Sequence, residues 1–272
     1  MGNHMADTDQ GQDPRLALVT GATGAIGKAI ALKIAQQPVY QVVLLCRNPH
    51  KADQAVNEII ELSGNQRVSR EVVDLSSKES IRTLARRLQN PVQVLVNNAA
   101  ITPRRRQETP AGIELQFATN VLGYFWLTRA LAEHLQAGSP ARVVNVASYW
   151  AGDLELDDLE FRSRPYNNNT AYRQSKQANR MLTVAFAERL REHGVTVNAC
   201  HPGDVNSNLS NRLGFGGHES PHEGARTPAW LAIDAIGQRE SGKYFEHMQM
   251  RRCQFGEDSV MVNALYQVCM AY

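Results

Sequence analysis

The chain has 272 residues, of which 43% are hydrophobic and 21% are charged, and its formal net charge is +2. This balance is typical of a globular protein and does not indicate a nucleic-acid binder. No run of about 18 apolar residues is present, so no membrane span is expected. The four cysteines, at positions 46, 200, 253 and 269, have neither zinc-site nor disulfide spacing. We therefore expect a cytoplasmic protein with reduced thiols and no metal site.

Short apolar runs alternate with longer amphipathic runs along most of the chain. The strands are expected at 16–20, 41–45, 68–73, 94–97, 142–147, 195–200 and 243–245, and the helices at 25–36, 50–62, 77–89, 112–137, 170–193, 223–236 and 257–268. This alternation predicts an α/β fold with a doubly wound parallel sheet of about seven strands and helices on both faces. Residues 1–13 are polar and are expected to be disordered or tag-derived, and 14–272 to form a single domain.

Two long polar segments interrupt the alternation, at 149–169 and at 203–222. Each follows an expected strand, at the edge where open parallel sheets bind their ligands. Long loops in a compact domain are usually functional. We expect both segments to be substrate loops.

A glycine-rich turn follows the first strand. Its sequence is Gly21-Ala22-Thr23-Gly24-Ala25-Ile26-Gly27, and a helix follows. Gly21 permits a tight turn, Gly24 lets the backbone approach a pyrophosphate, and Gly27 allows close packing. The amides of Ala25 and Ile26 would face an anion at the start of the helix. The context indicates a dinucleotide site, and the alternative is a glycine-rich turn without a ligand.

The residues after the second strand bear on the choice of cofactor. An acidic residue there holds the ribose 2′-hydroxyl of NAD, whereas an arginine suits the 2′-phosphate of NADP. This chain has Cys46-Arg47-Asn48 and no acid. Arg47 can bind a phosphate with two parallel hydrogen bonds, so NADP(H) is favoured over NAD(H). The alternative is a surface arginine without a role.

Tyr172 and Lys176 are four residues apart in an expected helix, so they share one face. A nearby ammonium group favours the phenolate and lowers the pKa of a tyrosine from its usual value of about 10. The pair alone is a weak signal, because most pairs at this spacing are solvated. It gains weight here from the nucleotide signature and from a preceding serine and asparagine.

Several further motifs follow one another along the chain. They are Val73-Asp74-Leu75, Asn97-Asn98-Ala99-Ala100, Asn120, Asn145-Val146-Ala147-Ser148 and His201-Pro202-Gly203. With the glycine-rich turn and the Tyr172/Lys176 pair, the chain resembles the short-chain dehydrogenase/reductase family over about residues 14–250. Residues 46–52, Leu156-Asp157-Asp158-Leu159 and 171–179 resemble its retinol-dehydrogenase-like branch, which also contains carbonyl reductases.

The resemblance implies a single-domain Rossmann fold and a set of catalytic roles. Tyr172 would be the general acid, Ser148 would hold the carbonyl oxygen, Lys176 would lower the tyrosine pKa and bind the nicotinamide ribose, and Asn120 would order a relay water. The resemblance also implies cofactor residues. Those of the turn and the second strand end, already expected, are Gly21, Thr23, Gly24, Ala25, Ile26, Gly27 and Arg47. The others are Asp74, Leu75, Asn98, Ala99, Ala100, Tyr172, Lys176, Pro202, Gly203, Val205 and Ser207. Ala25 stands where compact members of the family usually have glycine.

These observations favour an NADPH-dependent oxidoreductase acting on a small carbonyl or alcohol substrate, such as a retinal-like or xenobiotic aldehyde or ketone. Tyr149, Trp150 and Leu209 are the expected substrate contacts, and His201 is expected to pack structurally. A catalytically silent NADP(H)-binding sensor or scaffold is the alternative from another class, and a reductase of carbon–carbon double bonds is a third. Related proteins often pair through two long helices, so the resemblance implies a homodimer through 112–137 and 170–193 as one expected assembly, and a monomer is the other.

Overall fold

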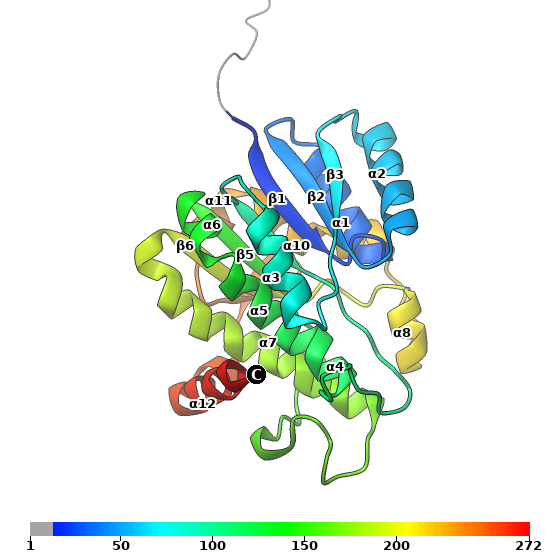
Figure 1. The fold of residues 1–272 in the computed structure, drawn as a ribbon, viewed down its shortest axis with the longest axis vertical. Coiled ribbons are helices and arrows are strands. Elements are labelled where there is room, and N and C mark those ends of the chain that lie inside the picture. The colour runs from blue at the N-terminus through cyan, green and yellow to red at the C-terminus, as the bar shows by residue number, and fades with distance from the viewer. Residues whose placement is uncertain (1–12) are drawn as a thin grey trace, which may run out of the picture.

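The expected parallel sheet is present in the computed structural model, which describes residues 13–272 (Figure 1). Eight strands follow the order β3-β2-β1-β4-β5-β6-β7-β8. They are β1 (Arg15–Thr20), β2 (Tyr40–Cys46), β3 (Val68–Val72), β4 (Val94–Asn97), β5 (Ala141–Val146), β6 (Val195–Cys200), β7 (Tyr244–Glu246) and β8 (Gln249–Arg251). The order reverses between β1 and β4, which opens a crevice at the carboxyl ends of these strands.

The eighth strand corrects the expectation of about seven. β8 runs antiparallel to β7, whereas every other pair is parallel. All three residues of β8 are exposed, so the segment has no apolar pattern that would predict a strand. Its pairing depends on the neighbouring strand rather than on its own sequence.

Helices cover both faces of the sheet, and each face has its own core. Alternate residues of β2 point to opposite sides, with Val43 and Leu45 in one core and Val42 and Leu44 in the other. One face carries α1 (Ala25–Ala35), α2 (Pro49–Ser63), α9 (Pro221–Gly224), α10 (Arg226–Ile233) and α11 (Ala235–Arg239). The other carries α3 (Lys78–Arg87), α5 (Gly123–Ala130), α6 (Ala132–Ala137), α7 (Asn168–Leu190) and α12 (Ser259–Ala271).

The helix expected at 112–137 is interrupted. It consists of α4 (Leu115–Phe117), a π-helical turn at Ala118–Leu122, α5 and α6. Asn120 lies in the π-helical turn, and its amide exchanges two hydrogen bonds with the backbone of Ile101, at 2.9 Å and 3.0 Å. Such turns are frequent at functional sites. The helix expected at 223–236 is likewise divided into α9, α10 and α11.

The expected substrate loops contain regular structure. Residues 203–222 include α8 (Asn208–Leu213), which begins at a capping box formed by Ser207 and Ser210. This helix was not expected, because six mostly polar residues have too short a pattern to predict one. In 149–169 a short 3₁₀ turn spans Leu156–Asp158, and α7 begins at Asn168.

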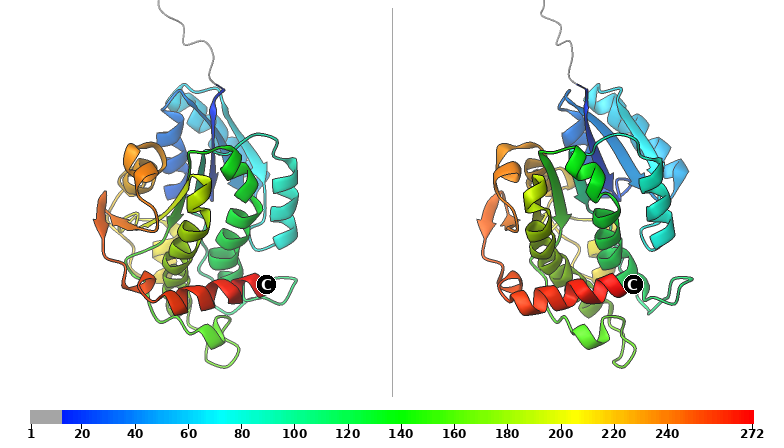
Figure 2. Two further views of the ribbon diagram at one scale, coloured as in Figure 1. Left: turned by 90° about the vertical axis from the view of Figure 1, so that its left-hand side faces the viewer. Right: turned by 60° about the vertical axis from the view of Figure 1, so that its left-hand side comes forward.

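Helix α12 lies across α5 and α7 (Figure 2). The ring of Tyr266 is 5.1 Å from that of Phe125 in α5 and 5.6 Å from that of Phe186 in α7. Part of the surface of the two long helices is therefore covered by the chain itself, and a homodimer through them stays a prediction. Within residues 13–272 no helix is both long and apolar enough to cross a bilayer. The expectation for 1–13 falls, except for Asp13, outside the described residues.

Candidate active site

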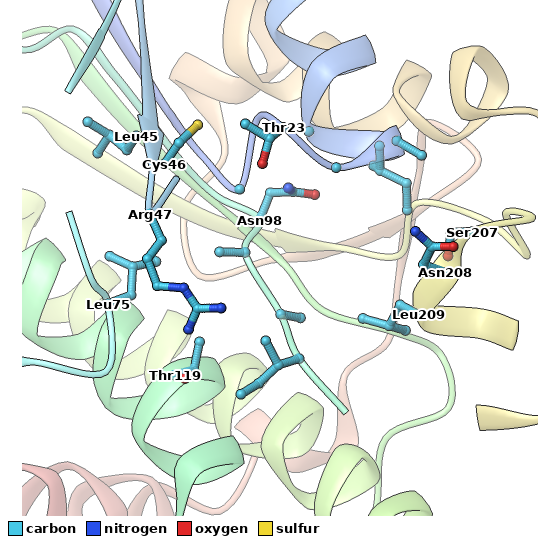
Figure 3. Close-up of a pocket in the computed structure, with 18 of the residues that line it drawn as sticks. Thr23, Leu45, Cys46, Arg47, Leu75, Asn98, Thr119, Ser207, Asn208 and Leu209 are labelled. Atoms are coloured by element: carbon cyan, nitrogen blue, oxygen red, sulfur yellow. The ribbon is translucent and has the colours of Figure 1, made fainter. Parts of the chain in front are cut away.

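A cavity of 390 Å³ lies at the carboxyl ends of β1, β2 and β4 (Figure 3). Most of the expected cofactor residues line it: Gly21, Thr23, Gly24, Ala25, Ile26, Gly27, Arg47, Asp74, Leu75, Asn98, Ala99, Ala100 and Ser207. Sequence reasoning missed Leu45, Cys46, Val73, Ile101, Thr102, Thr119, Asn208 and Arg212. Cys46 and Val73 lie within motifs already named, Leu45 directly precedes Cys46, and Ile101, Thr119 and Asn208 are immediate neighbours of residues expected at the site, so their positions next to these motifs could have indicated them.

The glycines of the first turn differ in the space around them. Gly21 has a φ of +65°, in the region that favours glycine. A Cβ at Gly27 would overlap the carbonyl oxygen of Gly21 and lie 2.5 Å from Nδ2 of Asn98. A Cβ at Gly24 would meet, among the described residues, only the Gly21 oxygen at 3.3 Å. Gly21 and Gly27 thus serve the packing of the loop, while Gly24 leaves open space beside the cavity.

Helix α1 begins at this open space. Gly24 is its N-cap and has no side chain that could accept from the first-turn amides. Ala25 and Ile26, the first two helical residues, line the cavity. Unpaired amides and the positive end of the helix dipole together attract an anion. The N-terminus of α1 therefore fits the pyrophosphate of a dinucleotide.

Charged side chains lie farther along the same cavity. Arg47 extends from the end of β2 into the cavity in Figure 3, and none of the ion pairs found within 13–272 involves it. The Asp74 carboxylate accepts hydrogen bonds from the amide and hydroxyl of Ser76, at 3.0 Å and 2.7 Å. Arg212 of α8 adds a second cationic group to the lining. Two arginines in one cavity favour a ligand with several phosphates.

Tyr172 and Ser148 come together at a second cavity, of 460 Å³. Tyr172 lies in the first turns of α7 and Ser148 follows β5; the two residues are 7% and 5% exposed. Burial raises the pKa of Tyr172 to about 12, against a hydrogen bond with Ser148 that lowers it. At neutral pH the tyrosine is therefore a protonated phenol.

The surroundings of Lys176 do not produce the lowered tyrosine pKa that was expected. The Nζ of Lys176 donates a hydrogen bond to the carbonyl oxygen of Val146 at 2.8 Å and lies 5.6 Å from the centroid of the Tyr172 ring. The side chain is fully enclosed, and this burial lowers the pKa of Lys176 to about 7. The expected downward shift of the tyrosine pKa is not found, because the desolvation of Tyr172 outweighs the other influences on it.

Asn120 is connected to the start of α7 by a chain of hydrogen bonds. Its Nδ2 donates to the Ser175 hydroxyl at 3.4 Å, and that hydroxyl donates to the backbone oxygen of Tyr172 at 2.7 Å. Asn120 is fully buried. The four expected catalytic residues therefore form one cluster, in which Ser148 and Tyr172 line the second cavity while Asn120 and Lys176 line neither cavity.

The second cavity has an aromatic lining. The expected substrate residues Tyr149, Trp150 and Leu209 line it, as do the cofactor candidates Tyr172, Pro202, Gly203 and Val205. The Trp150 ring lies 6.2 Å from that of Tyr172 and 5.8 Å from that of Phe215. Both cavities are lined by Ile26, Ser207 and Leu209, so they adjoin. The remaining lining residues are His201, which was expected only to pack structurally, and residues of the expected 203–222 substrate loop: Asp204, Ser210, Leu213, Gly214, Phe215, Gly217 and His218.

Comparisons with known proteins agree with this geometry. Residues 15–214 match the short chain dehydrogenase family. Retinol dehydrogenase 13 of Mus musculus is 36% identical over 255 residues, which cover 86% of this chain and 76% of that protein. A crystal structure of an uncharacterised protein from Mycobacterium paratuberculosis has a TM-score of 0.79 at 28% identity, covering 94% of this chain and 92% of that one. A metagenomic short-chain oxidoreductase in complex with NADP has a TM-score of 0.65 at 26% identity, with 85% and 95% covered.

The family acts as oxidoreductases on alcohol and carbonyl groups and uses nicotinamide cofactors. The match extends over most of the chain, and it includes the glycine-rich turn, Asn120, Ser148 and the Tyr172/Lys176 pair. The chain therefore belongs to the short-chain dehydrogenase/reductase family, in its retinol-dehydrogenase-like branch.

Proposed function

We propose that this protein is an NADPH-dependent oxidoreductase that reduces aldehydes or ketones and can oxidise the corresponding alcohols. The observation that carries the proposal is the position of Ser148 and Tyr172. Their hydroxyl groups are buried in a cavity that adjoins a second one with the features of a dinucleotide site. A carbonyl bound there would meet two hydroxyl donors beside the cofactor.

The choice of NADP(H) rests on Arg47. It follows β2, where no acidic residue is present to bind a ribose 2′-hydroxyl. Its guanidinium group lies in the cavity without an ion-pair partner among residues 13–272, so it is available for a 2′-phosphate. The solved relative that contains NADP supports the same choice.

The chemistry divides between the cofactor and the protein. NADPH, when bound, supplies the hydride that reduces the carbonyl carbon. Tyr172 donates its phenolic proton to the carbonyl oxygen as negative charge develops there, and Ser148 holds that oxygen with its hydroxyl. Lys176, one helical turn from Tyr172, stabilises the phenolate that proton transfer leaves behind. Asn120 holds the Ile101 backbone and the Ser175 hydroxyl in place by hydrogen bonds, next to the helical turn that carries Tyr172 and Lys176.

The test is the Tyr172→Phe variant, assayed with NADPH against a panel of aldehydes and ketones by the loss of reduced-cofactor absorbance. Removing the proton donor should lower kcat by a factor of about 100 or more. Tyr266→Phe is the matched control, because Tyr266 lies on α12 away from both cavities. Equal turnover by Tyr172→Phe and wild type would disprove the mechanism. Tight NADPH binding by a wild type that reduces no carbonyl would favour the sensor or scaffold function.

A further inference from the structure

One wall of the substrate cavity carries a carboxylate. Asp204 follows β6, and its side chain is 34% exposed. Its Oδ2 is 3.5 Å from the hydroxyl of Tyr149, and its Oδ1 is 4.0 Å from Nε2 of His201. The backbone oxygen of Asp204 is held separately, by the amides of His218 and Glu219 at 2.8 Å and 3.0 Å. The side chain is thus not required for the turn that positions it.

No cationic side chain neutralises this carboxylate within 13–272. No lysine or arginine lines the cavity. Burial lowers the pKa of His201 to about 3, with His247 and Arg180 acting in the same direction, so the imidazole next to Asp204 is uncharged. The other histidine of the cavity, His218, is exposed and makes no ion pair with Asp204.

His201 lies beside Asp204 in the same wall. The residue is 6% exposed and its ring packs edge-on against Tyr149, with centroids 4.6 Å apart. Its Nδ1 is buried and has no hydrogen-bond partner in the described part of the chain. This enclosed nitrogen offers no contact to a ligand, so it is the partly exposed Asp204 carboxylate that suits the wall to a polar group rather than to an apolar one.

Aromatic rings line the same cavity as the carboxylate. Tyr149 and Phe215 line the cavity and are each about half exposed, and the Trp150 ring packs against those of Phe215 and Tyr172. Aromatic faces attract cations, and the attraction adds to that of a nearby carboxylate. Arg173 lies 5.9 Å from the Trp150 ring, but Asp153 pairs with it at 2.6 Å and compensates its charge.

We propose that the cavity selects carbonyl compounds that carry a protonated amine, with the ammonium group against Asp204 and the rings of Tyr149 and Phe215. The carbonyl group would then face Ser148 and Tyr172. This inference rests on the proposed reductase function and names its substrate class. An apolar substrate would desolvate Asp204 without giving it a partner, whereas an ammonium group forms a charge-assisted hydrogen bond with it.

The test uses two aryl ketones of equal size, one ending in a dimethylammonium group and the other in the isosteric isopropyl group. Calorimetric titration in the presence of NADP⁺, which cannot reduce a ketone, gives the Kd of each without turnover. The ratio of kcat/KM with NADPH is the second readout. The variant is Asp204→Asn, which removes the charge and keeps the shape. Asp157→Asn is the control, because it removes one exposed charge of the other loop outside the cavity.

We expect the wild type and Asp157→Asn to bind the ammonium ketone about 10- to 100-fold more tightly than its neutral partner, and Asp204→Asn to lose this preference. Equal affinities in the wild type, or an unchanged preference in Asp204→Asn, would overturn the inference. If the wild type binds and reduces both ketones equally, the inference fails and the reductase function stands. If it reduces neither, the reductase function fails, while the binding preference still reports on Asp204.

Discussion

Substitution by alanine should affect mainly cofactor binding at Gly24 and mainly stability at Gly27. At Gly24 an added methyl group meets the Gly21 oxygen at 3.3 Å, and the φ of −86° is accessible to alanine. Alanine is a poor N-cap, so Gly24→Ala should lower the free energy of unfolding by about 1 kcal/mol or less. The methyl group would nevertheless occupy the space in front of the α1 amides. The affinity for NADPH should therefore fall by a factor of about ten or more.

Gly27→Ala should act mainly on stability. Its methyl group would overlap the Gly21 carbonyl oxygen and lie 2.5 Å from Nδ2 of Asn98. The backbone carbonyl cannot rotate away as a flexible side chain can, so the loop and α1 must separate. Forcing extra atoms into a packed site of this kind costs about 1–3 kcal/mol. Binding should weaken only as far as the displaced loop misplaces the amides.

Urea unfolding and NADPH fluorescence titration of both variants would measure the two effects. Gly64→Ala is a control for destabilisation itself, because Gly64 has a φ of +73° and open space around it, at the end of α2 away from the cavity. It should lose stability and keep its affinity. If Gly24→Ala bound NADPH as the wild type does, the α1 amides would not contact the phosphates. If Gly27→Ala were as stable as the wild type, the packing argument would be wrong.

Two further predictions concern charged groups. Arg47→Ala should weaken NADPH binding by a factor of about ten or more and leave NADH binding nearly unchanged, because a charge-assisted hydrogen bond to phosphate contributes about 1.5–3 kcal/mol; an unchanged ratio of the two Kd values would remove Arg47 from cofactor selection. Burial raises the pKa of Glu114 to about 7, against hydrogen bonds from the amides of Gln116 and Phe117. The folded protein therefore holds a proton that the unfolded chain releases from about pH 4.5 upward, so stability falls as the pH rises toward 7, by about 3 kcal/mol from this group. Glu114→Gln should remove that decline, and parallel unfolding profiles for variant and wild type at pH 5 and 8 would contradict the assignment.

Local patterns determined much of this protein. The strand–helix alternation follows from side-chain periodicity, and the glycine-rich turn follows from the conformations that only glycine allows at Gly21. Tyr172 and Lys176 share a face because they are one helical turn apart. The order of the motifs then identified the family, and the sheet and the retinol-dehydrogenase-like relatives confirmed it. These features could be predicted because each depends on residues close together in the sequence.

Other features depended on the tertiary structure. β8 forms because β7 offers it a partner, and the helix expected at 112–137 is interrupted where Asn120 bonds to the distant backbone of Ile101. Tyr149 meets Asp204 and His201 because the sheet order brings the loops after β5 and β6 together. The pKa of Tyr172 moved upward rather than downward, since it depends on how completely the fold removes water from the ring. Spacing along the chain specifies which groups are neighbours on one element, whereas burial and contacts between elements arise only when the elements pack.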